Sequence, residues 1–121
     1  MTGDPAAAGF WAALDELVAS CRIVIDRPRG TSHPRYPELI YPLSYGYLDG
    51  THAIDAGGID VWRGSSSSTN VDAVLCTVDL AKRDAEIKVL IGCSDEDRRS
   101  ILDFSNRGSM RALLVERPAS A

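Results

Sequence analysis

Two short apolar runs separated by a charged turn constrain the fold of this chain more than any other feature. Residues 74–80 are long enough for a buried strand, and residues 86–91 follow after a turn that holds Lys82 and Arg83. Runs of this length, rich in Val and Ile, are typical of strands. The pattern predicts a β-hairpin, and no apolar run approaches the roughly 18 residues of a membrane span.

Two helices are expected on either side of the predicted strands. Residues 9–20 carry apolar side chains at helical spacing, and Ser94 is a good N-cap for a second helix that ends near residues 106–108. Further strands are predicted at 22–26, within 41–47, at 59–62 and at 110–115. We therefore expect one mostly β (α+β) domain over residues 1–121: an N-terminal helix (1–20), an antiparallel sheet or small barrel of five to six strands (21–93), and a C-terminal helix and strand (94–121).

The overall charge narrows the classes of partner. Thirteen basic and seventeen acidic side chains give a formal net charge of −4, which is the wrong sign for bulk capture of nucleic acid or of an anionic membrane. Small ligands or metal ions are the expected partners. The first basic residue is Arg22, so the Ala-rich start lacks the positive segment of a signal peptide, and a cytoplasmic location is expected.

The three cysteines and the first helix each leave two interpretations open. Cys21, Cys76 and Cys93 are odd in number and show no C-x-x-C spacing, which favours buried reduced thiols over a reactive or metal-binding cysteine. Phe10 and Trp11 are interpreted either as part of the core or as a subunit interface in a homo-oligomer.

Carboxylates cluster at two predicted turns. A Gly-Gly turn lies between Asp55 and Asp60. The hairpin turn lies between Asp79 on one side and Asp84 and Glu86 on the other. Mg²⁺ takes one or two carboxylates together with water and substrate phosphate oxygens, so sparse Asp residues at neighbouring strand ends suit it. His33 and His52 are a poor ligand set for zinc.

Strand periodicity places Asp84, Glu86 and Lys88 on one face of the second hairpin strand and Ile87 and Val89 on the other. Two interpretations follow. Either the charged face meets water, or it forms a site for a metal and an anion.

A basic, proline-rich loop follows the first predicted strand. It carries Arg27, Arg29, His33 and Arg35, and is either an ordinary solvated loop or a cradle for phosphate, because a stiff loop holds several guanidinium groups at low entropic cost. Three tyrosines come next, and they are either core aromatics or donors to a phosphate: Tyr41, Tyr45 and Tyr47.

These residues resemble a known family. Residues 41–47, Y-P-L-S-Y-G-Y, followed by Asp55-x-x-x-x-Asp60, resemble the Y-P-x-N-Y-G-[FY] and D-G-D-P-x-D signatures of the soluble family I inorganic pyrophosphatases. Upstream, I-D-R-P-R-G-T at 25–31 is similar to the family's E-I-P-K-G-S strand end. Downstream, Asp79 and Glu86-Ile-Lys88 resemble its later Asp…Asp-x-Lys ligands, so the resemblance covers about residues 22–91.

The resemblance implies an OB-type antiparallel barrel and a Mg²⁺-dependent hydrolase in which a metal-activated water attacks pyrophosphate. The implied metal ligands are Asp55, Asp60 and Asp79, with Asp84 or Glu86 completing the set. Asp60, Tyr45 and Asp55 would be catalytic, and Asp26 would take the place of an upstream Glu. The implied phosphate contacts are Tyr41, Tyr45 and Lys88, and the basic loop adds Arg27, Arg29 and Arg35, with His33 as a further substitute for the family's cations.

The sequence departs from the family at one central position, because Gly57 stands where the family's acidic motif has its middle Asp. Three functions therefore stay open. The first is hydrolysis of inorganic pyrophosphate. The second is an enzyme of the same fold that acts on another phosphorylated, biosynthetic substrate with Asp60, Asp79 and Tyr45 as acid and base groups. The third is a non-catalytic binding module.

Overall fold

The computed structural model describes residues 4–53 and 57–119 and contains one six-stranded sheet and two helices. In chain order the elements are α1 (Pro5–Ala19), β1 (Ile23–Arg27), β2 (Ser44–Leu48), β3 (Ile59–Arg63), β4 (Val71–Asp79), β5 (Asp84–Ile91), α2 (Asp95–Ser105) and β6 (Met110–Glu116). The predicted hairpin is confirmed as β4 and β5, and the predicted number of strands and helices is confirmed too.

The strands lie in the order β1-β2-β3-β5-β4-β6. All neighbours are antiparallel except β3 and β5, which pair in parallel with Val61 opposite Val89. The expectation of a wholly antiparallel sheet was therefore wrong at this pair. The reason is the path of the chain. After β3 the chain passes to β4, which does not pair with β3, and then returns as β5, which lies between β3 and β4.

The sheet is open in the described part of the chain. β1 and β6 lie at its two ends, and no ladder joins them. The closed barrel that the resemblance implied is not confirmed.

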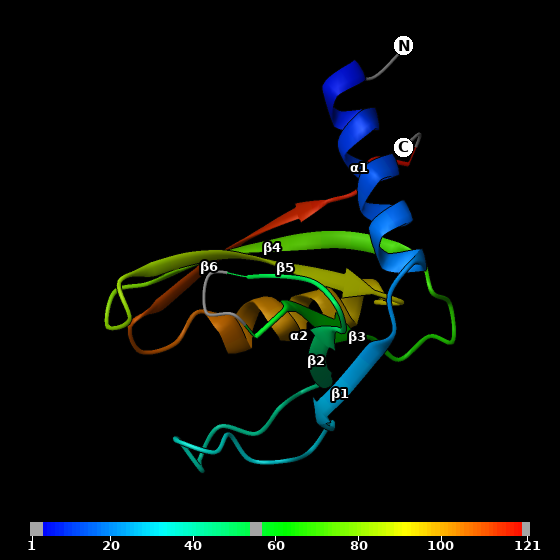
Figure 1. Ribbon diagram of the computed structural model, residues 1–121. Coiled ribbons are helices and arrows are strands. Elements are labelled where there is room, and N and C mark those ends of the chain that lie inside the picture. The colour runs from blue at the N-terminus through cyan, green and yellow to red at the C-terminus, as the bar shows by residue number, and fades with distance from the viewer. Residues whose placement is uncertain (1–3, 54–56, 120–121) are drawn as a thin grey trace.

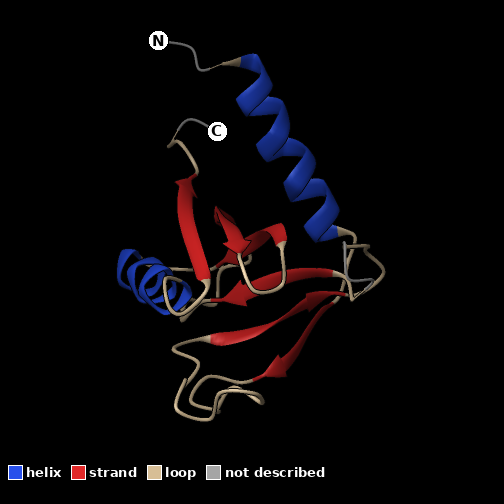
Figure 2. Cartoon of the chain, turned by 90° about the vertical axis from the view of Figure 1, so that its left-hand side faces the viewer, coloured by secondary structure: helices blue, strands red, loops and turns tan. Residues whose placement is uncertain are grey.

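The two helices cover opposite faces of the sheet (Figures 1 and 2). Because successive strand side chains alternate, Val74 and Val89 pack towards Trp11 of α1, whereas Leu75 and Leu90 pack towards Ile101 of α2. Figure 1 shows α1 rising steeply from one face and α2 lying along the other. No helix in the ranges 4–53 and 57–119 is long and apolar enough to cross a membrane.

Local capping chemistry sets where both helices begin. α2 starts after Ser94 as predicted, where Ser94 Oγ accepts a hydrogen bond from the Asp97 N–H and Asp97 accepts one from the Ser94 N–H. α1 starts at Pro5, four residues before the predicted range, because Asp4 caps it by accepting from the Ala6 N–H.

Gly46 explains the central glycine of the tyrosine-rich motif. It pairs with Ile25 on one side and Val61 on the other, and a Cβ there would collide with the Val24 carbonyl. Only glycine lets β1 approach this closely, next to the register shift between Ile25 and Arg27.

The interpretations of the cysteines and of the first helix have different outcomes. Cys93 is a buried free thiol, and burial raises its pKa to about 12, while Cys21 and Cys76 are free and half-buried. Trp11 is a core residue at 3 % exposure, but its neighbour Phe10 is 44 % exposed. The core interpretation is confirmed for Trp11 alone.

Candidate functional site

Lys88 lies at the centre of a polar cluster on the α2 side of the sheet. Its side chain is 10 % exposed, and Nζ lies 2.6 Å from Tyr45 Oη, 3.1 Å from Asp60 Oδ2 and 3.5 Å from Glu86 Oε2. Three strands contribute, because β2, β3 and β5 are neighbours. We call these four residues the Lys88 cluster.

Strand pairing accounts for the contact between Asp60 and Lys88. Each residue precedes one member of the parallel pair Val61 and Val89, so the two lie side by side and point to the same face. The ammonium group is thus held by one carboxylate across the strand pair and by a second, Glu86, two residues away on its own strand.

Tyr45 joins the ammonium and the carboxylate of this cluster. Its hydroxyl accepts a hydrogen bond from Lys88, whose ammonium group also donates to Asp60. Burial raises the pKa of Tyr45, and the neighbouring Asp60 carboxylate raises it further. The phenol therefore stays protonated.

A second polar pair lies beside the cluster. Arg27, at the end of β1, donates to the Tyr41 hydroxyl at 2.7 Å, and Tyr41 itself is only 3 % exposed. The Tyr41 and Tyr45 ring centroids are 5.6 Å apart, and both rings pack on Trp62. This aromatic packing holds the Arg27 pair at a fixed position relative to the Lys88 cluster.

Helix α2 closes one side of the site through Phe104, whose ring lies 5.1 Å from Tyr41 and 5.6 Å from Trp62. Sequence analysis did not single out Phe104. Helical spacing could have found it. Phe104 follows Ile101 by three residues and therefore lies on the same helix face, and both belong to the same core cluster.

The structure brings together only some of the predicted phosphate contacts. Arg27, Tyr41, Tyr45 and Lys88 converge, as the preceding distances show. Three other predicted residues lie elsewhere and are exposed to solvent: Asp26, Arg29 and Arg35. His33, between them in the sequence, is half-buried, and its ring stacks on Tyr41 with centroids 5.9 Å apart and an angle of 5° between the planes.

The predicted metal ligands also separate into groups. Asp60 and Glu86 meet at Lys88, while Asp84 lies opposite Asp79 at the far end of the hairpin. Of the two alternatives left open, the structure therefore places Glu86 and not Asp84 in the cluster. Asp55 lies outside the described residues, and within these no group of three or more His, Cys, Asp or Glu is placed to hold a metal ion.

Asp79 organises the hairpin turn. Its Oδ1 accepts hydrogen bonds from the N–H groups of Ala81 and Lys82 and from the Ser109 hydroxyl, at 3.0, 3.1 and 2.8 Å. The backbone hydrogen bond from Lys82, followed by the bond from Ser109, lowers the pKa of Asp79. Its carboxylate is thus committed at one oxygen to the turn and to the segment before β6.

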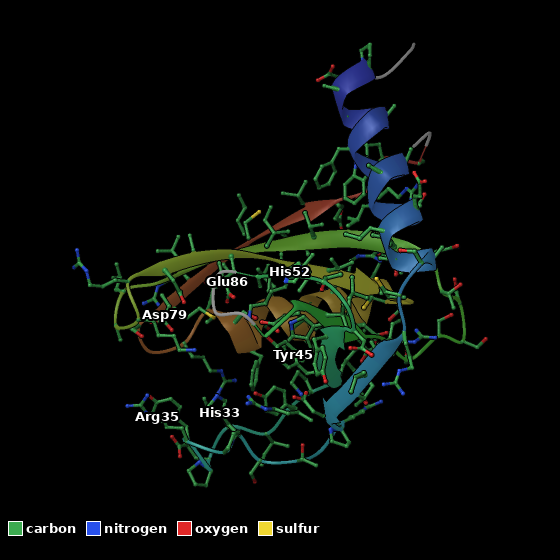
Figure 3. The ribbon with its side chains drawn as sticks, in the orientation of Figure 1. His33, Arg35, Tyr45, His52, Asp79 and Glu86 are labelled. Atoms are coloured by element: carbon green, nitrogen blue, oxygen red, sulfur yellow. The ribbon has the colours of Figure 1, made fainter. Side chains whose placement is uncertain are left out.

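The direction of the charged face of β5 corrects one interpretation (Figure 3). Asp84, Glu86 and Lys88 do share a face, but Lys88 is buried on it and both carboxylates are half-buried, with Glu86 alone of the two in the Lys88 cluster. The opposite face carries Ile87 at 52 % exposure. The interpretation that the charged face simply meets water is therefore wrong.

No protein-family model matches the chain, and no curated protein matches it either. The resemblance to the pyrophosphatases therefore depends on the short motifs and on the geometry of the residues that those motifs contain.

Proposed function

We propose that the chain is a Mg²⁺-dependent hydrolase of inorganic pyrophosphate. The Lys88 cluster is the observation that carries the proposal, since it gathers an ammonium group, a protonated phenol and two carboxylates from three strands. These are the groups that phosphoryl transfer needs, namely cations and hydroxyl donors for the phosphate oxygens and carboxylates for a metal ion.

Each side chain has a distinct part in this proposal. Arg27 and Lys88 bind phosphate oxygens and neutralise their charge, and the Tyr41 hydroxyl orients Arg27. Tyr45 keeps its proton and positions Lys88 against Asp60. Phe104 and Trp62 limit the access of water from the α2 side.

Asp60 and Glu86 fit the metal that the resemblance implies. Both are oxygen ligands held close to one ammonium group, and Mg²⁺ commonly uses one or two carboxylates, leaving its other positions to water and phosphate. When bound there, the metal would supply an activated water and neutralise phosphate charge. Asp55 and the free oxygen of Asp79 remain predicted ligands, and the sheet is proposed to be an open variant of the OB-type barrel.

One observation favours a second candidate, an enzyme of the same fold with another phosphorylated substrate. Tyr45 keeps its proton and accepts a hydrogen bond from Lys88, an arrangement that can present a hydroxyl donor to a substrate other than pyrophosphate. Gly57, in place of the acidic residue of the family motif, points the same way.

Phosphate release from pyrophosphate, with and without Mg²⁺, tests the first candidate. We expect metal-dependent turnover that falls about a hundredfold or more in Asp60→Asn and Tyr45→Phe. Asp103→Asn, which removes an exposed carboxylate on α2, is the matched control and should keep full activity. Folded wild-type protein with no release above background would overturn the proposal and direct the search to other phosphorylated substrates.

A further inference from the structure

The connection between β1 and β2 holds an imidazole in one orientation beside the site. The backbone N–H groups of Arg35 and Tyr36 both donate to His33 Nδ1, at 3.0 and 3.2 Å. The backbone N–H of His33 donates to the Leu39 carbonyl at 2.8 Å. The loop thus folds around its own histidine.

These two hydrogen bonds fix which ring nitrogen carries the proton. Nδ1 accepts from two donors, so it has no proton of its own, and the neutral ring must carry its proton on Nε2. An imidazolium would direct a third N–H at the two backbone donors. His33 is therefore a neutral donor through Nε2–H, not the substitute cation that the sequence suggested.

The charges around His33 come from three parts of the fold. Burial lowers the pKa of His33, and the positive charges of Arg27 at the end of β1, Lys82 in the β4–β5 turn and Arg35 in the loop lower it further. Glu38 is the opposing charge. A region with several cations and a neutral N–H donor favours an anion.

Stacking on Tyr41 couples the imidazole to the site. The two rings are nearly parallel, and the Tyr41 hydroxyl accepts the hydrogen bond from Arg27. One buried tyrosine thus positions both the imidazole and the guanidinium group. In Figure 3, His33 and Arg35 lie on the left-hand side of the molecule, below Asp79 and Glu86 of the hairpin.

We propose that His33 and Arg27, both held by Tyr41, form a binding subsite for a phosphate group, to which Lys82 of the β4–β5 turn adds positive charge. His33 Nε2–H donates to a phosphate oxygen, while Arg27 and Lys82 balance its charge. The inference rests on the proposed function in one respect, that this phosphate is one end of the substrate. The same chemistry would bind free phosphate or the terminal phosphate of a larger molecule.

Nitrogen-detected NMR of the imidazole rings tests the subsite in the whole chain, with inorganic phosphate as the probe. We expect the His33 signals to show a protonated Nε2 and an unprotonated Nδ1 before phosphate is added, and the Nε2 signal to shift on addition. His52→Gln assigns the signals, because the chain has two histidines. A ring protonated at Nδ1, or one that phosphate leaves unchanged, would overturn the proposal.

Three variants, two of them a matched pair at neighbouring positions, measure the contribution of single groups to phosphate affinity. In His33→Asn the amide oxygen can replace Nδ1 as acceptor for the backbone, but no donor reaches as far as Nε2, so phosphate affinity should fall about tenfold. Lys82→Asn should weaken binding about threefold, since Lys82 is exposed. Arg83→Asn removes the same charge at the next residue, and Asn tolerates the positive φ there, so affinity should stay unchanged. Equal affinity in wild type and His33→Asn would contradict the subsite.

The same experiments separate this inference from the proposed function. Phosphate that shifts His33 Nε2 in a protein without pyrophosphate turnover would support the subsite and reject the hydrolase. The opposite result is pyrophosphate turnover in which wild type and His33→Asn have the same KM and the same phosphate affinity. That result would support the hydrolase and reject the subsite.

Discussion

The Arg117 guanidinium and the Asp15 carboxylate form a two-bond ion pair, with Nη1 to Oδ1 at 2.7 Å and Nη2 to Oδ2 at 2.8 Å. The pair joins the segment after β6 to α1. Arg117 also lies 5.7 Å from the centre of the Trp11 ring and donates to the Val71 carbonyl. One arginine therefore connects α1, the start of β4 and the C-terminal segment.

Asp15→Asn should lower the free energy of unfolding by about 1 kcal/mol, a value kept small because the Asp15 side chain is 45 % exposed and solvent screens the pair. The hydrogen bond from Arg117 lowers the pKa of Asp15 below its ordinary 3.8. The stabilisation is therefore present above that value and is lost as the pH falls through the lower pKa of the folded state. Urea unfolding followed by tryptophan fluorescence at several pH values measures it. Glu16→Gln is the exposed neighbouring control, and an equal loss in both variants would reject a specific role for Asp15.

Asp97 should be one of the most sensitive polar residues. It is 7 % exposed, and its Oδ2 accepts from the N–H and hydroxyl of Ser65 and from the Ser94 N–H. Burial alone raises the pKa of Asp97, but these hydrogen bonds outweigh burial and lower it. Asp97→Ala should cost about 2 kcal/mol, because it leaves buried donors without an acceptor.

The pH dependence of the free energy of unfolding shows whether the ionised carboxylate of Asp97 is the stabilising form. The wild-type advantage over Asp97→Ala should be complete above the ordinary Asp pKa of 3.8 and should shrink as the pH falls below it. Glu96→Gln, on the exposed side of the same helical turn, should show neither the loss nor the pH dependence. An advantage that persists in strong acid would mean that the carboxylate is not the stabilising group.

Lys88→Met should lower the free energy of unfolding by about 3 kcal/mol, because it leaves Asp60 and Glu86 together in a largely buried site without their cation. If these carboxylates bind Mg²⁺ as proposed, the metal should raise the Tm of the variant more than that of wild type. Thermal unfolding with MgCl₂ and with an equal ionic strength of NaCl separates specific binding from screening. An identical response to both salts would contradict metal binding at this pair.

Asp79→Asn separates a structural role from a metal-binding role. The variant should lose about 1 kcal/mol of stability, because a neutral amide oxygen is a weaker acceptor for Ala81, Lys82 and Ser109. If Asp79 acts only in the turn, Mg²⁺-dependent turnover should persist at temperatures where the variant is folded. A large increase in the Mg²⁺ concentration needed for turnover, with Asp84→Asn as the unaffected control, would instead make Asp79 a ligand.

Local sequence patterns predicted the elements of this fold closely. The hairpin strands, the Ser94 cap of α2 and the last strand lie within a few residues of their predicted bounds, because side-chain periodicity and capping are properties of short segments. The same periodicity placed Glu86 and Lys88 on one face. It could not show that this face points inward, since alternation relates side chains to one another and not to the rest of the molecule.

The motifs likewise identified most members of the candidate site without indicating how they are arranged. Tyr41, Tyr45, Asp60 and Lys88 stood out from the sequence, whereas Asp79 and Asp84 shared the same carboxylate chemistry but lie at the hairpin end. The neutral state of His33 depends on two backbone N–H groups that face it only once the loop has folded.

The sequence by itself determined which segments are helices and strands, which side chains share a face, and which residue types are available for phosphate chemistry. The tertiary structure alone decided that Asp60 and Lys88, 28 residues apart, become neighbours. That contact requires the parallel pairing of β3 with β5. The pairing forms only when β5, and not β4, is the hairpin strand that lies next to β3. The pairing of distant strands depends on the packing of the whole sheet between α1 and α2, and no local pattern in the chain encodes it.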